Sequence, residues 1–264
     1  MLASAGLHAF WNWLVADARD SHAVGAVALL TAAIVFAPVA VLTWDVQSGA
    51  WPYIVASALL ELAYFALLAA AYERADLSFV YPIARGTAPV LVLIVSLAAL
   101  GAELSTGEAV GVVAVAAGVL LVRGVGSGAA SGLVMALGVA ACIAAYTLVD
   151  DEGVRHAAAL SYFEAVLLIT APVYAVAVAF ARGPGALREA ATPRSAAAGV
   201  AMFGAYALAL GALEIAEAAP VAALRETSVV MATAAAAIVG REVVPPRRLV
   251  GAVVVVVGVA LIAL

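Results

Sequence analysis

The segment YPIARGTAPV, residues 81–90, places a charged side chain near the middle of a long apolar run. A charge close to the bilayer centre costs roughly 2.5 to 3.5 kcal/mol on insertion scales, so Arg85 is expected to face a bundle interior or a water-filled cavity. Tyr81 precedes it by one helical turn and shares its face. The prolines and the glycine of the segment can bend or open the helix. The segment therefore predicts a cavity wall that presents Arg85 and Tyr81 to a substrate. The alternative is an ion pair that fixes this helix.

Further ionisable residues occur inside apolar runs. Glu61 and Glu164 are carboxylates within such runs, and either one could neutralise an arginine or carry a coupling proton. Glu61 lies nearer the middle of its run and is the preferred proton carrier. Arg225 and Glu226 occur at a related depth in a later run. Adjacent helix positions point about 100° apart, so one of them can face a cavity while the other braces a neighbouring helix.

Polar and aromatic side chains complete the predicted cavity wall. Residues three or four apart share a helix face, which groups His8 with Asn12 and Glu61 with Tyr64. Tryptophan and tyrosine are also common anchors at the membrane interface, and a histidine can be an ordinary interior residue. The candidates of this kind for substrate binding are His8, Trp11, Asn12, Tyr64, Tyr146 and Tyr206.

The composition identifies the class of protein. The chain has 264 residues, of which 67% are hydrophobic and 11% charged, whereas soluble domains have roughly 45 to 50% apolar and 25% charged residues. It is therefore an integral membrane protein. The net charge of −5 indicates no nucleic-acid partner. The sequence has no glycine-rich phosphate loop, no paired Cys/His metal set and no Ser-His arrangement, so neither an enzyme nor a cofactor is expected.

Apolar runs long enough to cross a bilayer recur along the chain. A crossing needs about 20 mostly apolar residues, and these runs are alanine-rich without the alternation of a membrane barrel. The fold class is therefore all-α, a bundle of transmembrane helices. The ten predicted helices are residues 1–17, 22–43, 52–72, 76–100, 106–122, 130–149, 158–181, 195–213, 217–239 and 248–264.

Two stretches of the sequence resemble each other. Residues 101–122 and 240–262 each contain Gly-x-Glu, a short loop and a pair of glycines. Small residues at such spacing favour close helix packing over ligand binding. The glycines are seven residues apart in both stretches, Gly111 with Gly118 and Gly251 with Gly258.

This similarity predicts two repeats of five helices, residues 1–126 and 127–264. A unit with an odd number of crossings starts and ends on opposite sides, so its copy must be inverted in the membrane. Inverted repeats are typical of secondary transporters, whose substrate site lies near the midplane between the halves. The alternative is a duplication that only made a stable bundle.

The motifs HAFWN, YPIARGTAP, YTLVDDEGVR and the two Gly-x-Glu endings resemble the EamA family of the drug/metabolite transporter superfamily, over essentially the whole chain. The resemblance implies ten helices in two inverted repeats around a central cavity. It also implies movement of amino acids, other metabolites or drugs, with export as the expected direction. It does not imply a particular substrate.

The sequence thus predicts a secondary transporter that exports small polar or amphipathic metabolites across the bacterial inner membrane. Its expected partners are a small-molecule substrate, the lipid bilayer and protons as the candidate coupling ion, and it is expected to be a monomer or a homodimer. Two alternatives stay open: a flippase for lipids or lipid-linked intermediates, and a membrane protein that does not transport.

The arginines give a prediction of orientation. The side that is richer in arginine is expected to be cytoplasmic, which would place both termini outside, whereas the family resemblance implies termini inside. We follow the charge count. Of the arginines in predicted loops, only Arg155 lies on one side, and the other side has Arg19, Arg74, Arg123, Arg182, Arg188, Arg194, Arg241, Arg247 and Arg248.

Overall fold

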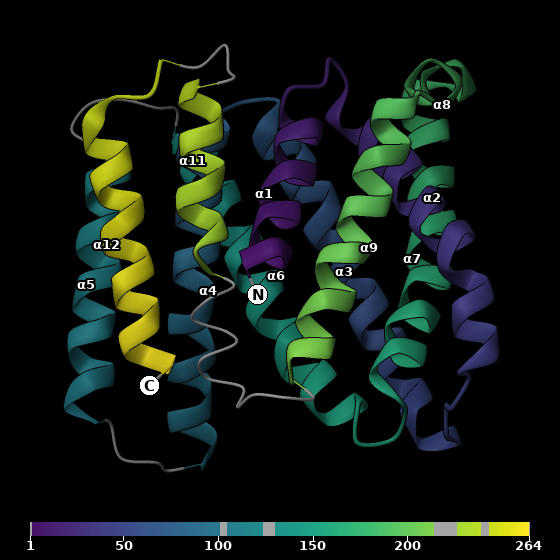
Figure 1. Cartoon of the computed structure of the whole chain (residues 1–264), viewed down its shortest axis with the longest axis horizontal. Coiled ribbons are helices and arrows are strands. Elements are labelled where there is room, and N and C mark those ends of the chain that lie inside the picture. The colour runs from purple at the N-terminus through teal and green to yellow at the C-terminus, as the bar shows by residue number, and fades with distance from the viewer. Residues whose placement is uncertain (1, 101–104, 124–129, 214–225, 239–242, 264) are drawn as a thin grey trace.

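The computed structural model is folded almost entirely into helices joined by short connections (Figure 1). It describes residues 2–100, 105–123, 130–213, 226–238 and 243–263. The helices are α1 (Leu2–Ala16), α2 (Ser21–Leu42), the short 3₁₀ turn η1 (Ser48–Ala50), α3 (Trp51–Tyr72), α4 (Leu77–Leu100), α5 (Thr106–Arg123), α6 (Ala130–Gly153), α7 (Ala159–Arg182), α8 (Pro184–Ala190), α9 (Pro193–Leu213), α11 (Ser228–Ile238) and α12 (Pro246–Ala263).

Capping residues and prolines set several helix boundaries. The side chain of Asp20 accepts a hydrogen bond of 2.9 Å from the backbone N–H of Ala23 and so caps α2. Ser105 and Glu108 form a reciprocal capping box before α5, with N···O distances of 2.7 and 3.1 Å. Prolines occupy the first position of α8, α9 and α12, where their missing N–H costs nothing. The helix α8 lies in the connection between the predicted helices 158–181 and 195–213.

Within the described residues, six helices are long and apolar enough to cross a membrane, so the chain is a multi-pass membrane protein. Two further apolar helices are shorter. Nine of the predicted helices coincide with observed ones within a few residues. The predicted helix 217–239 lies partly outside the described residues, and its described part contains α11. Large apolar side chains on the outer faces are exposed, as expected for contact with lipid, among them Ile34, Val41, Phe180 and Val257.

The helices lie side by side along the long axis of the molecule, with α5 and α12 at one end and α2 and α7 at the other (Figure 1). Their contacts come in related pairs: α1 packs on α9 and α3 on α6, α2 on α9 and α3 on α7, and α1 on α11 and α4 on α6. The counterparts in the two halves are α1 and α6, α2 and α7, α3 and α9, α4 and α11, and α5 and α12. Exchanging each helix for its counterpart turns one contact of each pair into the other. In addition, α2 packs on α7, α4 on α11 and α5 on α12.

Close packing of α5 on α12 depends on glycines. A Cβ atom added at Gly111 would lie 2.7 Å from the carbonyl oxygen of Gly258, and one added at Gly118 would lie 2.8 Å from that of Gly251. Additions at Gly251 and Gly258 meet the carbonyl oxygens of Gly118 and Gly111 at the same close range. The low-numbered glycine of one helix faces the high-numbered glycine of the other, so the two helices run antiparallel.

One end of the bundle is held by ion pairs between the two halves of the chain. Arg182 lies 3.0 Å from Glu73 and 3.7 Å from Asp20. Two further arginines near helix starts make equivalent contacts, Arg194 with Asp17 at 2.5 Å and Arg248 with Asp76 at 2.7 Å. In each pair the carboxylate comes from the first half and the arginine from the second. We call these four contacts the ion-paired end.

The ion-paired end is the arginine-rich side, so labelling tests its orientation. In a Cys142→Ala background, we expect an impermeant maleimide applied to intact cells to label Val154→Cys but not Glu189→Cys, because the arginine-rich side faces the cytoplasm. Both positions are exposed, and they lie at opposite ends of the bundle. Labelling of Glu189→Cys alone would reverse the orientation, and permeabilised cells provide the control for reactivity.

Candidate functional site

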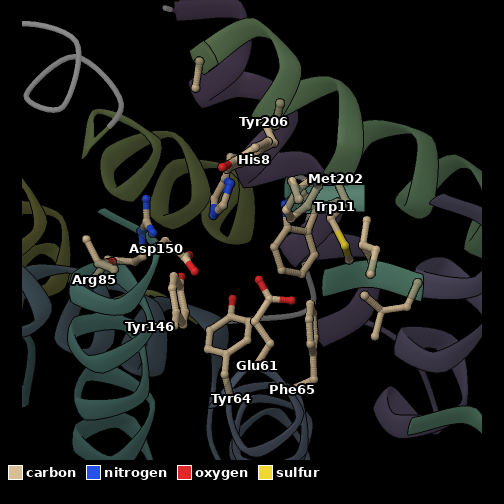
Figure 2. A pocket seen from close by; sticks show the side chains of 16 residues that line it. His8, Trp11, Glu61, Tyr64, Phe65, Arg85, Tyr146, Asp150, Met202 and Tyr206 are labelled. Carbon is tan, nitrogen blue, oxygen red and sulfur yellow. The ribbon is translucent and has the colours of Figure 1, made fainter. Parts of the chain in front are cut away.

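A cavity of about 210 Å³ lies between helices from both halves of the chain. Figure 2 shows its wall. We call it the main cavity. Drug-sized ligands occupy pockets of roughly 300 to 1,000 Å³, so this space suits a small molecule. Its wall is formed by His8, Trp11, Leu29, Glu61, Tyr64, Phe65, Arg85, Tyr146, Thr147, Asp150, Phe163, Leu167, Met202, Ala205, Tyr206 and Ala209.

Most of the predicted site residues lie in this wall, although they come from five different helices. The predicted residues that line the cavity are His8, Trp11, Glu61, Tyr64, Arg85, Tyr146 and Tyr206. Their lining positions are on α1, α3, α4, α6 and α9, and the packing of these helices brings them together. A role in substrate binding stays a prediction for each of them.

The other predicted residues are placed differently. Tyr81 is buried against α11, where its hydroxyl donates a hydrogen bond of 3.0 Å to Ser228 Oγ. Asn12 is fully buried, and its Oδ1 accepts a hydrogen bond of 2.8 Å from the hydroxyl of Tyr72. Both side chains therefore support the helix packing behind the cavity wall. Arg225 lies outside the described residues.

The ion-pair partner of Arg85 is Glu226, rather than Glu61 or Glu164. The guanidinium Nη2 donates to Glu226 Oε1 at 3.0 Å, and the two side chains are only 7% and 6% exposed. The pair forms because α4 packs on α11. The repeats align Arg85 with Glu226, so this contact joins equivalent positions of the two halves.

Glu61 and Glu164 differ in their surroundings. Glu61 points into the main cavity in the space between Trp11 and Tyr64 (Figure 2). It is 9% exposed, and it forms no hydrogen bond or ion pair with any described residue. Glu164 is fully buried, its carboxylate oxygens have no hydrogen-bond partner among the described residues, and it does not line the cavity.

Sequence reasoning missed Asp150 as a wall residue. It precedes two further acidic residues in YTLVDDEG, which looks like the solvated end of a helix. In the structure it lines the cavity and accepts a hydrogen bond of 2.9 Å from the hydroxyl of Tyr162. The signal that could have found it is its spacing: Asp150 follows Tyr146 by four residues and shares its helix face.

A second cavity of about 330 Å³ lies between α4, α6 and α12. It shares Arg85 and Thr147 with the main cavity, and Glu226 also lines it. Its remaining wall is apolar and includes Pro89 and Ile143. The buried ion pair therefore stands where the two cavities approach each other. Among the described residues, no group of three or more His, Cys, Asp or Glu could hold a metal ion.

Comparison with protein families gives one result. Residues 1–124 and 130–264 match the model of the EamA-like transporter family. The matches cover nearly the whole chain and divide it into two repeats. They confirm the resemblance seen in the sequence motifs. No curated protein matches the sequence.

Proposed function

Because the chain belongs to the EamA-like transporter family, we propose that it is a secondary transporter that moves a small polar or amphipathic metabolite through the main cavity. The observation that carries this proposal is Glu61: a buried carboxylate without a described partner, in an apolar bundle and facing the main cavity. Such a group is costly in a membrane and marks a substrate or ion pathway. Glu61 is also our candidate for the proton carrier.

The packing supports ten crossings in two inverted five-helix repeats, 1–126 and 127–264. The glycine contacts show α5 and α12 antiparallel, as inversion requires of counterpart helices. The reciprocal helix pairs have the pattern of a two-fold axis. The cavity wall draws on α1, α2, α3 and α4 from one half and on α6, α7 and α9 from the other. In inverted-repeat transporters, a site between the halves becomes accessible from each side in turn as the halves rock.

The ion-paired end provides the closure in this scheme. Its four contacts all cross between the halves, so the halves cannot separate there without breaking them. We place this end at the cytoplasmic face of a bacterial inner membrane, with export as the net direction and a monomer or homodimer as the functional unit. Opening would exchange these contacts for water, which is inexpensive for the partly exposed pairs of Arg182 and Arg194 and more costly for Arg248, whose side chain is 11% exposed.

The second cavity favours one alternative function. Its mostly apolar wall meets the polar Arg85 and Glu226, which suits a lipid with its headgroup at the ion pair. A flippase would therefore use the second cavity, whereas a metabolite transporter would use the main cavity. Blocking one cavity at a time separates the two functions.

Filling the main cavity tests the proposed function. We expect a screen of amino acids, purines, organic acids and organic cations to include a ligand that stabilises the purified protein. At a hundredfold excess over Kd, the ligand should raise the apparent free energy of unfolding by about 2.7 kcal/mol, which is detected as a higher melting temperature. Ala209→Trp should abolish that effect, because Ala209 lines the cavity. Leu208→Trp is the matched control on the same helix, since Leu208 is 45% exposed on the outer face.

Proteoliposomes test transport of the same ligand by the wild type, Ala209→Trp and Leu208→Trp. We expect the wild type and Leu208→Trp to transport it and Ala209→Trp not to. A folded Ala209→Trp variant that still binds and transports the ligand would place the substrate elsewhere and overturn the proposal. Lipid scrambling or flipping by a protein with a filled main cavity would favour the flippase.

A further inference from the structure

We infer that the main cavity is a binding site for a small organic cation, a molecule whose ammonium group lies between Glu61 and Asp150 among aromatic rings. This inference rests on the proposed function and names its substrate class. The first observation is the charge of the wall. Among the described wall residues, Glu61 and Asp150 are carboxylates and Arg85 is the one arginine. The charge of Arg85 is balanced by Glu226 at 3.0 Å, outside the main-cavity wall.

The two carboxylates are thus left without an opposing charge inside the described wall. Glu61 has no described partner. Asp150 is held by a neutral donor, the hydroxyl of Tyr162 at 2.9 Å, which fixes its direction without neutralising it. A charged group inside a membrane bundle needs a counter-charge close by. A cationic ligand supplies that charge, whereas an organic acid would add a third negative group to the same space.

The aromatic side chains of the wall favour the same ligand. The rings of Tyr64 and Tyr146 meet nearly edge to face, with centroids 5.9 Å apart and an interplanar angle of 82°. His8 and Trp11 meet at 73° with centroids 5.2 Å apart. Rings at such angles present both faces and edges to the cavity (Figure 2). Ring faces carry partial negative charge and attract ammonium groups, most strongly at tryptophan.

The size of the space limits the cation. About 210 Å³ accommodates one ring with a short chain and leaves little room for a larger drug. Apolar wall residues such as Leu167 and Met202 can receive such a ring. The combined features describe a primary or quaternary ammonium attached to a compact apolar group.

Three probes that share a benzene ring and differ mainly in head-group charge test the inference: 2-phenylethylammonium, 2-phenylethanol and 3-phenylpropanoate. We expect the purified wild-type protein to bind the ammonium at least about tenfold more tightly than the alcohol, and the acid most weakly, as measured by calorimetry. Hydrogen bonds to charged groups contribute about 1.5 to 3 kcal/mol. Glu61→Gln and Asp150→Asn should therefore each weaken ammonium binding by roughly tenfold to a hundredfold and change alcohol binding by less than about twofold.

Two matched variants control for the loss of a carboxylate. Glu164→Gln removes a buried carboxylate that does not line the cavity, and Asp151→Asn removes an exposed one beside Asp150 that pairs with Arg155 at 3.6 Å. Both should bind the ammonium as the wild type does. Melting curves identify any variant that fails to fold. If either Glu61→Gln or Asp150→Asn does not fold, the other one decides the result.

The outcomes separate this inference from the proposed function. Equal or tighter binding of the alcohol or the acid, abolished by Ala209→Trp, would overturn the cation site while supporting a transport cavity. Ammonium binding that survives in both Glu61→Gln and Asp150→Asn would also overturn it. If none of the three probes binds the wild type, the cation site is rejected, and the wider ligand screen decides the proposed function separately.

Discussion

Replacing Arg85 by alanine is expected to lower the free energy of unfolding by about 3 to 5 kcal/mol, the usual cost of removing one partner of a buried ion pair. Its partner Glu226 is only 5% exposed. Denaturation of the detergent-solubilised protein measures the change. The exposed Arg155, whose side chain is 64% exposed, provides the matched control. Its replacement by alanine should cost less than about 1 kcal/mol.

The double variant Arg85→Leu with Glu226→Leu distinguishes structure from function at this pair. Apolar residues of similar volume often replace a buried ion pair without loss, so this protein should recover most of the stability that Arg85→Ala loses. We expect it to fold but to transport poorly, because the polar group between the two cavities is gone. An Arg85→Ala protein as stable as the wild type would show that Arg85 does not stabilise the helix packing and would assign it to the substrate instead.

Replacing Gly118 by valine is expected to destabilise the protein by about 3 kcal/mol, at the upper end of the usual range for overpacking. The added Cβ would lie 2.8 Å from the carbonyl oxygen of Gly251 and 2.8 Å from the backbone nitrogen of Val255. Backbone atoms cannot rotate away as a side chain can, so α5 and α12 must separate. Thermal unfolding monitored by circular dichroism measures the loss.

Gly6 provides the control for this prediction. It also lies inside a helix, but an added Cβ would meet nothing within 4 Å. Gly6→Ala should therefore be neutral or stabilise the protein by up to about 1 kcal/mol, since alanine favours the helix. If Gly118→Val melts like Gly6→Ala, the contact between α5 and α12 is not close in the folded protein.

The helices were predictable from the sequence because two physical signals agree. The length of each apolar run is set by the bilayer, and capping residues, glycines and prolines interrupt the runs. Close packing at the glycines of α5 and α12 was predictable for a related reason, since small residues at this spacing favour helix contacts. The spacing alone did not show that the two helices pack on each other. The short helix α8 was not predicted, because seven residues give no periodic signal.

The cavity was predictable only in part. Arg85 and Glu61 were found because a charge within an apolar run is costly, so it is expected to face a cavity or a partner inside the bundle. Tyr81 shows the limit: its spacing from Arg85 gives a common helix face, but the neighbour that covers this position, Ser228, depends on how α4 packs on α11. Asp150 was missed because acidic residues at a helix end are usually solvated. The partner of Arg85 is 141 residues away, and only the alignment of the repeats could have suggested it.

The division of charge at the ion-paired end makes the two halves of the chain complementary and not interchangeable. All the carboxylates in these four contacts belong to the first half. Consider two copies of that half, paired as the two halves are now. Since Gly251 corresponds to Gly111, the position of Arg248 would be taken by Glu108, which would face Asp76 with like charge. The end of α2 at Leu42 would replace Arg182 and leave Glu73 and Asp20 without their arginine. Electrostatics at this end thus favours the unlike halves over two copies of the first half, as it would between the subunits of a heterodimer.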